Sequence, residues 1–338
     1  MRYKREEAWF PLSEDILGWD QNFHQLMLND QLRMTTYRSA IQETVKSGTI
    51  VADIGTGTGI LALWALEAGA GKVYGIEINK DRAAKAIQRV ENAGFGNEFE
   101  IINAISYDAK LPEKVDLIIS EILGNLGDNE DMVRVLNDAR RRFLKNDGRF
   151  LPKLVETYLV PVSAWTTHQQ IMDKKVKSIG SAHNLGNLMD RLDIHDQFDL
   201  YYDSIIPLTS YLSKPSLTRK FNFDGNDEAE YQTRCTFMVG SDGLFTGFKG
   251  YFIAQLSEHV YLNISGDDIE GRQTSDCLKH CYLPVKKTFE VKVGDMIELI
   301  FARKYPLQTD SPFRQCYQWS GTIYRNNASV HTFEQKTC

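Results

Sequence analysis

The sequence contains little cysteine, and its cysteines are not grouped. Of the 338 residues only five are cysteine, and none of them forms a Cys-x-x-Cys pair: Cys235, Cys277, Cys281, Cys316 and Cys338. A scattered, odd-numbered set of this kind argues against a disulfide framework and against a structural zinc site, and it favours a reducing compartment. We therefore expect no metal centre.

Long apolar runs and an excess of positive charge are also missing. No stretch of 18 apolar residues occurs, and the first ten residues, MRYKREEAWF, lack the apolar segment of a secretory signal. The net charge of -6 gives no basic footprint for nucleic acid. We expect a cytoplasmic protein without a membrane or direct nucleic-acid partner; a nuclear location stays open if the source is eukaryotic. Most of the charges form a solvated surface, although an acidic surface also attracts cationic substrates.

Changes in hydrophobic pattern divide the chain into three parts. Residues 1–48 are polar and predict helices. In residues 49–153, short apolar strands alternate with helical segments, which is typical of a parallel, doubly wound α/β sheet. The last helix of this part, EDMVRVLNDARRRFLKNDG, is expected to end at Gly148, and an earlier one to begin after Asn79. Residues 154–338 predict an all-β barrel or sandwich, interrupted by a helical insertion at about 166–202.

A glycine-rich turn, VADIGTGTG, joins the first predicted strand to the next helix. The glycines let the backbone turn sharply and approach a ligand closely. A dinucleotide fingerprint would require a third glycine at Ile60, so an NAD site is disfavoured. Asp53 precedes the turn, and Glu77 ends the next strand, where a carboxylate suits two ribose hydroxyls. The pattern resembles class I S-adenosylmethionine-dependent methyltransferases; a glycine turn that binds no ligand is the alternative.

Two glutamates flank the loop SEILGNLGDNE, which follows an apolar strand. Glu121 lies at the carboxyl end of this strand, where open α/β sheets bind ligands. Glu130 begins the next helix, so both carboxylates can face one pocket. Two carboxylates beside a methyl donor suit a guanidinium, a planar cation with a fixed fork of donors. The alternative is that Glu130 caps the helix while Glu121 is solvated.

At this point the sequence resembles the protein arginine methyltransferases. SEILGNLGDNE resembles their double-glutamate loop, and FHQLMLNDQLRMTTYRSAI their N-terminal helix. VADIGTGTGILALWALEAGAGKVYGIE is similar to their cofactor motif, and FTGFKGYF and VKVGD to segments of their β-barrel. The resemblance implies a Rossmann-like S-adenosylmethionine-binding domain, followed by a β-barrel domain with a helical dimerisation arm. It also implies a head-to-tail homodimer in which the arm contacts the partner's Rossmann domain.

The resemblance assigns roles to individual residues. It implies that S-adenosylmethionine, released as S-adenosylhomocysteine, is held by His24, Arg33, Asp53, Gly55, Gly57, Glu77, Ile105 and Ser106. Glu121 and Glu130 would clamp the substrate arginine, with Asp30 accompanying them. Met27 and Met132 occupy places that restrict the substrate, although methionines at helical spacing are equally well core residues. As further alternatives, Asp30 and Arg33 could pair with each other on a helix, and His24 could be structural.

The sequence departs from the family pattern in two places. The N-terminal motif that covers the cofactor carries tyrosines in the family, but Glu14 and Gly18 stand at the expected offset here. The family's Thr-His-Trp segment corresponds to Thr274-Ser275-Asp276, with Gln273 and His280 nearby but out of register. A general base is therefore either absent or not needed. The product, mono-, asymmetrically or symmetrically methylated, is not assigned.

Three functions remain open from the sequence. The first is methyl transfer to arginine in a protein or peptide. The second is methyl transfer to free arginine or another small guanidino compound, which the altered cover and the missing histidine favour. The third is a weakly active or inactive partner subunit, which the intact glycine loop and both glutamates oppose.

Overall fold

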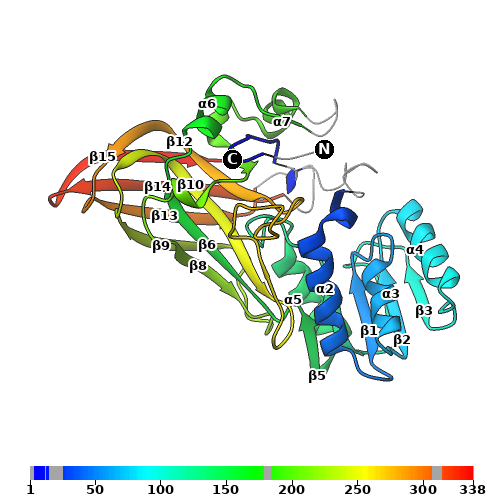
Figure 1. The fold of residues 1–338 in the computed structure, drawn as a ribbon. Helices are drawn as coiled ribbons and strands as arrows, with labels where there is room; N and C mark the ends of the chain where they lie inside the picture. The colour runs from blue at the N-terminus through cyan, green and yellow to red at the C-terminus, as the bar shows by residue number, and fades with distance from the viewer. Residues whose placement is uncertain (1–3, 12, 15–25, 179–183, 307–313, 338) are drawn as a thin grey trace.

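The computed structural model describes residues 4–11, 13–14, 26–178, 184–306 and 314–337. His24, Gly18 and Cys338 therefore lie outside the described residues. Figure 1 shows a parallel sheet with helices at one end of the molecule and a larger antiparallel part at the other. In the described part of the chain, no helix is long and apolar enough to cross a membrane.

The N-terminal half of the molecule is a five-stranded parallel sheet of order β3-β2-β1-β4-β5. Its strands are β1 Ile50–Ile54, β2 Lys72–Ile76, β3 Phe99–Ile102, β4 Val115–Ser120 and β5 Leu144–Leu151. Its helices are α2 Gln31–Thr44, α3 Ile60–Glu67, α4 Lys80–Asn92 and α5 Met132–Phe143. The strand order reverses between β1 and β4, so a ligand crevice is expected at their carboxyl ends. The predicted Rossmann-like arrangement is confirmed.

The predicted start of α4 agrees with the structure, whereas the predicted end of α5 does not. The side chain of Asn79 accepts a hydrogen bond of 3.0 Å from Arg82 N, so the predicted cap of α4 is confirmed. The predicted end of α5 at Gly148 is wrong, because the helix ends at Phe143 and Gly148 lies inside β5. Phe150 and Leu151 are buried there and pair with β4, and this tertiary pairing outweighs the helical pattern of the preceding residues.

The second half consists of two antiparallel sheets that share an aromatic core. One has the order β7-β12-β10-β6-β8, with β11 beside β10, and the other the order β15-β14-β13-β9. Contacts between rings of the two sheets, such as Phe237 with Phe248 at 5.9 Å, fill the space between them. The strands are β6 Leu154–Val162, β7 Tyr202–Ser204, β8 Ser216–Phe221, β9 Tyr231–Met238, β10 Gly243–Gln255, β11 Tyr261–Asn263, β12 His280–Val291, β13 Met296–Lys304, β14 Cys316–Arg325 and β15 Ala328–Lys336.

The helical insertion packs against the N-terminal segment. It contains α6 Trp165–Met172 and α7 Leu185–Leu192, followed by the short 3-10 helix η2 Gln197–Asp199; a second such helix, η3, spans Leu208–Ser210. The prediction of helix for residues 1–48 is wrong for residues 4–11, because backbone bonds tie this segment to β7 and to the helical insertion. Trp9 N donates to Asp203 O at 2.8 Å, and Phe10 N donates to Lys177 O at 2.7 Å.

The described cysteines only partly follow the prediction. Cys235, Cys277 and Cys281 are free and buried, whereas Cys316 is disulfide-bonded. The expectation of unbonded cysteines therefore does not hold for Cys316. Within the described residues, no group of three or more His, Cys, Asp or Glu side chains could hold a metal ion.

Candidate active site

A cavity of about 210 Å³ lies at the carboxyl ends of β1 and β4. Its wall is formed by the glycine turn after β1, the loop after β4, the N-terminal helical region and the β part. Its wall includes Met27, Arg33, Gly55, Gly57, Glu77, Glu121, Glu130, Asp203, Cys277 and Leu278. The cavity therefore lies at the topological switch point of the sheet, where the fold predicts a ligand.

The glycine turn forms one wall of this cavity. Gly55 and Gly57 have φ values of +73° and +56°, a backbone region in which glycine is unstrained. The carboxylate of Glu77 accepts hydrogen bonds from Gly57 N at 2.9 Å and from Asn79 N at 2.8 Å. These bonds fix the end of β2 against the turn, and they hold the Glu77 carboxylate at the cavity.

Asp53 lies beneath the turn rather than on the cavity wall. Its side chain is fully buried and accepts a hydrogen bond of 2.6 Å from Thr56 Oγ1. Burial raises the pKa of Asp53 to about 7. Asp53 therefore supports the turn from below.

The loop after β4 is short, closely packed and bonded to both halves of the molecule. Gly127 N donates to Gly124 O at 2.8 Å, closing a turn between the two glutamates. A Cβ atom on Gly124 would lie 2.1 Å from Asn129 Oδ1, so only glycine fits there. Thr157 of β6 donates its hydroxyl to Leu126 O at 2.8 Å. The loop thus has little freedom to move its glutamates.

Glu121 is largely buried, with 8% of its side chain exposed, and forms an ion pair with Arg33. Arg33 Nη2 contacts Glu121 Oε2, and Arg33 Nη1 donates to Met27 O at 3.0 Å. Burial alone would lower the pKa of Arg33, but the Glu121 carboxylate raises it above its usual value. Burial raises the pKa of Glu121, and Arg33 opposes this shift. A solvated Glu121 is therefore excluded.

Glu130 lines the same cavity as Glu121. The N-cap of α5 is Asp131, so the alternative in which Glu130 caps the helix is wrong. Burial raises the pKa of Glu130 to about 8, and the negative charges of Glu121 and Asp203 add to this effect. A cation entering the cavity would favour the charged form of both carboxylates.

Asp30 contacts the β part at the segment without a histidine. Its Oδ2 accepts a hydrogen bond from Ser275 Oγ and others from Asp276 N at 2.8 Å and Cys277 N at 3.0 Å. Its Oδ1 accepts from the backbone N of Arg33 at 3.0 Å, as a helix N-cap. The two side chains do not simply pair with each other, because the guanidinium of Arg33 contacts Glu121. Ser275 occupies the place in which a histidine was expected.

His280 does not replace the missing histidine. Its Nδ1 accepts from Ile206 N at 2.9 Å, and its Nε2 lies 2.9 Å from Ile264 O. Burial lowers the pKa of His280 well below its usual value. Both ring nitrogens are therefore used inside the β part.

Comparisons with known proteins agree with this geometry. A family model described as ribosomal protein L11 methyltransferase (PrmA) matches residues 35–152. The protein arginine N-methyltransferase PRMT10 of Oryza sativa is 37% identical over 158 residues, which are 46% of this chain and 41% of that protein. Protein arginine N-methyltransferase 6 of Danio rerio is 36% identical over 157 residues, 45% of each chain. Over nearly half of its length this chain is therefore similar to protein arginine N-methyltransferases. It spans less than half the length of the curated relatives that it matches.

The shared fold extends over nearly the whole chain. The structure of Arabidopsis thaliana protein arginine methyltransferase 10 has a TM-score of 0.77 at 21% identity, and covers 94% of this chain and 98% of that one. The Trypanosoma brucei PRMT1 enzyme-prozyme heterotetrameric complex with AdoHcy has a TM-score of 0.76 at 19% identity, with the same coverage. The β part thus has the fold of the arginine methyltransferases, although the sequence matches cover only part of the chain.

Several residues assigned from the family resemblance do not line the cavity. Met132 is fully buried in the core on α5, as the alternative reading held. Ile105 and Ser106 follow β3 and do not line the cavity. The backbone O of Ser106 accepts a hydrogen bond from Arg142 away from the cavity wall. Met27 does line it. His24 lies outside the described residues.

Sequence reasoning missed one carboxylate at the cavity, in addition to Glu77, Glu121 and Glu130. Asp203 on β7 is buried, lines the cavity and accepts a hydrogen bond of 2.6 Å from Asn125 Nδ2 in the loop. Asn125 in turn accepts from Asn129 Nδ2 at 2.7 Å. Asp203 stands in an ordinary strand sequence, YYDSII, and no local pattern marks it as a site residue.

Proposed function

We propose that this protein transfers a methyl group from S-adenosylmethionine to a guanidino nitrogen of arginine in a protein or peptide. The observation that carries the proposal is that Glu121 and Glu130 line one cavity, together with the glycine turn and Glu77. A neutral or anionic acceptor would gain nothing from several buried carboxylates. A guanidinium neutralises them and offers donors on two edges.

The residues at the glycine turn fit the cofactor. Gly55 and Gly57 leave room for a close approach, since neither has a Cβ atom facing the cavity. Glu77 would hold the ribose hydroxyls, and Arg33 would hold the cofactor carboxylate, with Asp53 supporting the turn. When bound, the cofactor supplies a methyl group on a positively charged sulfur. Arg33 would then divide its donors between that carboxylate and Glu121.

The two glutamates orient and polarise the substrate. Glu121 and Glu130 would accept hydrogen bonds from two edges of the guanidinium and draw its charge toward the nitrogens they contact. The remaining nitrogen is then the better nucleophile, placed toward the methyl group. A nitrogen–carbon bond forms as the sulfur–carbon bond breaks, with the electron pair returning to sulfur. The nitrogen loses a proton, and the product remains a cation.

The proton does not require a histidine. Asp30 contacts Ser275, which does not titrate near neutral pH, and His280 is turned away. Glu130 has its pKa near 8, so it can exchange a proton with water at neutral pH. This arrangement supports proton loss during or after methyl transfer, through Glu130 or water.

A smaller acceptor is the second candidate. Glu121, Glu130 and Asp203 in a cavity of about 210 Å³ would also suit free arginine or another small guanidino compound. An inactive subunit is the third candidate, and one structural neighbour is an enzyme-prozyme complex. A cavity that keeps both glutamates together with the glycine turn favours an active enzyme.

We also propose that the protein forms a homodimer through the helical insertion. The inner face of α6 and α7 packs on the chain itself, including Trp9 and Phe10. Two large apolar side chains at the ends of α6 remain exposed: Trp165 at 44% and Met172 at 46%. These two side chains are the apolar positions of α6 that a partner subunit would cover in the proposed dimer.

The test of function is product identification by mass spectrometry with isotopically labelled S-adenosylmethionine. An arginine-glycine-rich peptide and free L-arginine are incubated side by side. A methyl group on the peptide arginine supports the proposal, and fragment ions then identify mono-, asymmetric or symmetric products. Methyl transfer to free arginine alone would move the function to the small-molecule candidate. Neither product, with cofactor bound, would support the inactive subunit.

A further inference from the structure

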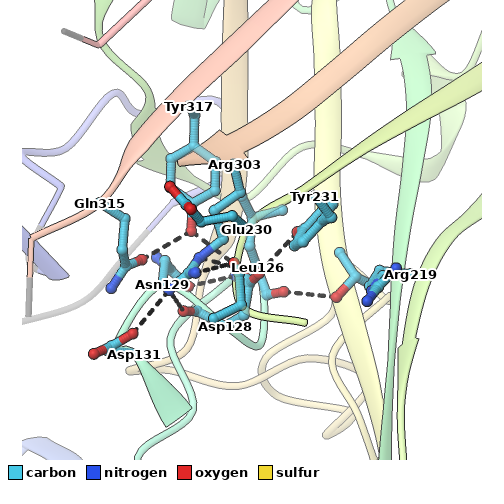
Figure 2. Close-up of polar contacts among 12 residues, drawn as sticks. Leu126, Asp128, Asn129, Asp131, Arg219, Glu230, Tyr231, Arg303, Gln315 and Tyr317 are labelled. Atoms are coloured by element: carbon cyan, nitrogen blue, oxygen red, sulfur yellow. Dashed lines mark hydrogen bonds and ion pairs between the residues drawn. The ribbon is translucent and has the colours of Figure 1, made fainter. Parts of the chain in front are cut away.

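A buried arginine of the β part holds the residues on both sides of Glu130. Arg303 on β13 lies with Nε 3.4 Å from Asp128 Oδ2 and with Nη2 3.1 Å from Asp131 Oδ1. All three side chains are completely buried. Figure 2 shows Arg303 reaching into the loop that carries Asp128 and Asp131. One side chain therefore joins the residue two before Glu130 to the residue directly after it.

Tyrosines from the same sheet complete the contact. Tyr231 of β9 donates its hydroxyl to Asp128 Oδ2 at 2.8 Å, and Tyr317 of β14 donates to Asp128 Oδ1 at 3.2 Å. The hydroxyl of Tyr305 donates to Asp131 Oδ1. Three neighbouring strands thus converge on a loop that belongs to the other half of the molecule.

The backbone next to Glu130 has an unusual conformation. Asp131 has φ +60°, a left-handed conformation that residues other than glycine seldom adopt. Such a conformation persists where the surroundings determine it, and it is common at functional sites. The contacts to Arg303 and Tyr305 supply these surroundings. They therefore fix the direction in which the chain leaves Glu130.

We propose that Arg303 is a positioning residue for methyl transfer, because it holds Asp128 and Asp131 so that the carboxylate of Glu130 points into the cavity. This inference rests on the proposed function. An arginine suits the task because its planar fork can bind two carboxylates at once, whereas a lysine offers a single point of charge. Small displacements of a reacting group reduce the rate steeply, so a loosened loop lowers turnover more than binding.

The experiment compares Arg303→Lys with wild type in steady-state methyl transfer to the arginine-glycine-rich peptide. We expect kcat to fall about 10- to 100-fold. The Kd for S-adenosylhomocysteine should stay within about two-fold of wild type, since Arg303 touches no cofactor residue. Thermal melts fix an assay temperature at which the variant is folded. A purely structural arginine would lower the Tm but leave the kcat of the folded enzyme unchanged.

A matched control is available in the same sheet. Arg325 of β14 binds Asp295 through Nε at 2.9 Å and Nη2 at 2.7 Å, and neither residue lines the cavity. Arg325→Lys makes the same chemical change and should leave kcat unchanged. If Arg303→Lys does not fold, Tyr231→Phe removes one bond to Asp128 and should lower kcat several-fold with cofactor binding kept.

The outcomes separate the two proposals. Wild-type kcat in folded Arg303→Lys, or in Tyr231→Phe where the lysine variant does not fold, would overturn the positioning role while leaving the proposed function in place. A loss in Arg325→Lys equal to that in Arg303→Lys would overturn it as well, because the effect would then not depend on the loop. A wild-type enzyme that methylates no guanidino compound would overturn the proposed function, and the inference with it.

Discussion

Asp203 and Glu130 line the same cavity although they belong to different halves of the molecule. Glu130 ends the loop after β4, and Asp203 lies on β7 of the antiparallel part. Burial is the main cause of the raised pKa of Glu130, and the charges of Glu121 and Asp203 raise it further, against the effect of Arg33. The β part thus contributes to the protonation state of the site as well as to its shape.

Neutralising Asp203 should change the pH dependence of the reaction. In Asp203→Asn the amide oxygen can still accept the hydrogen bond from Asn125, but the negative charge is lost. The pKa of Glu130 then falls, because a like charge no longer opposes its ionisation. The acidic limb of kcat/KM, which reports groups of the free enzyme, should move to lower pH by up to about one unit.

The control for this shift is Asp242→Asn. Asp242 is an exposed carboxylate that binds Val293 N and Lys292 on another part of the β surface. The substitution Asp242→Asn should leave the pH profile of kcat/KM unchanged. An acidic limb at the wild-type position in Asp203→Asn would show that Asp203 does not act on Glu130.

Replacing Glu130 should alter how stability depends on pH. The pKa of Glu130 is raised from 4.5 in the reference state to about 8 in the folded protein. The folded state therefore holds a proton that the unfolded state loses between these values, so this group's contribution to stability declines as pH rises from about 5 to 8. Glu130→Gln removes the decline. Between about pH 5 and 8, the free energy of unfolding of the variant should rise relative to that of wild type by up to ~1 kcal/mol per pH unit.

Chemical denaturation at several pH values measures this difference. Glu258→Gln is the matched control, because Glu258 is exposed and Lys153 lowers its pKa. The difference in free energy of unfolding between Glu258→Gln and wild type should not change with pH above pH 5, because the Glu258 carboxylate is charged in both the folded and the unfolded state. If the difference in free energy of unfolding between Glu130→Gln and wild type is also independent of pH, the pKa of Glu130 is not raised in the folded protein.

The proposed dimer can be tested on the exposed end positions of α6. Trp165→Glu combined with Met172→Glu should shift the protein to a monomer in light scattering, because charges would replace apolar contact area. Substitution is preferable to deletion, since the inner face of the insertion belongs to the protein's own core. Val293→Glu, at an exposed position in the turn after β12, should leave the dimer intact. A dimer that survives the double substitution would rule out this contact.

The sequence allowed prediction of features that a continuous segment encodes. The glycine turn, Glu77 and the glutamates of the loop follow from strand ends and spacing, and the structure brings them to one cavity. The end of α5 could not be read locally, because pairing with β4 decides where β5 begins.

Contacts between distant segments were not accessible from the sequence. Asp203 and Arg303 stand in stretches whose local pattern indicates only a strand. Their importance comes from what the other half of the chain presents to them: Glu130 and the loop aspartates. The residues next to each of them in the sequence do not indicate which distant residue it contacts.

The substitution Glu121→Gln shows whether Glu121 and Glu130 hold a guanidinium beside the methyl donor. The amide oxygen can still accept a hydrogen bond from Arg33, so the fold and the cofactor site should remain, but a neutral amide cannot clamp a cation. The measurement pairs the rate of methyl transfer with the Kd for S-adenosylhomocysteine. Glu67→Gln serves as control, because Glu67 forms an exposed pair with Arg38 at 3.5 Å. We predict a loss of at least about 100-fold in rate with the Kd nearly unchanged. A rate close to wild type, with cofactor bound, would contradict the account.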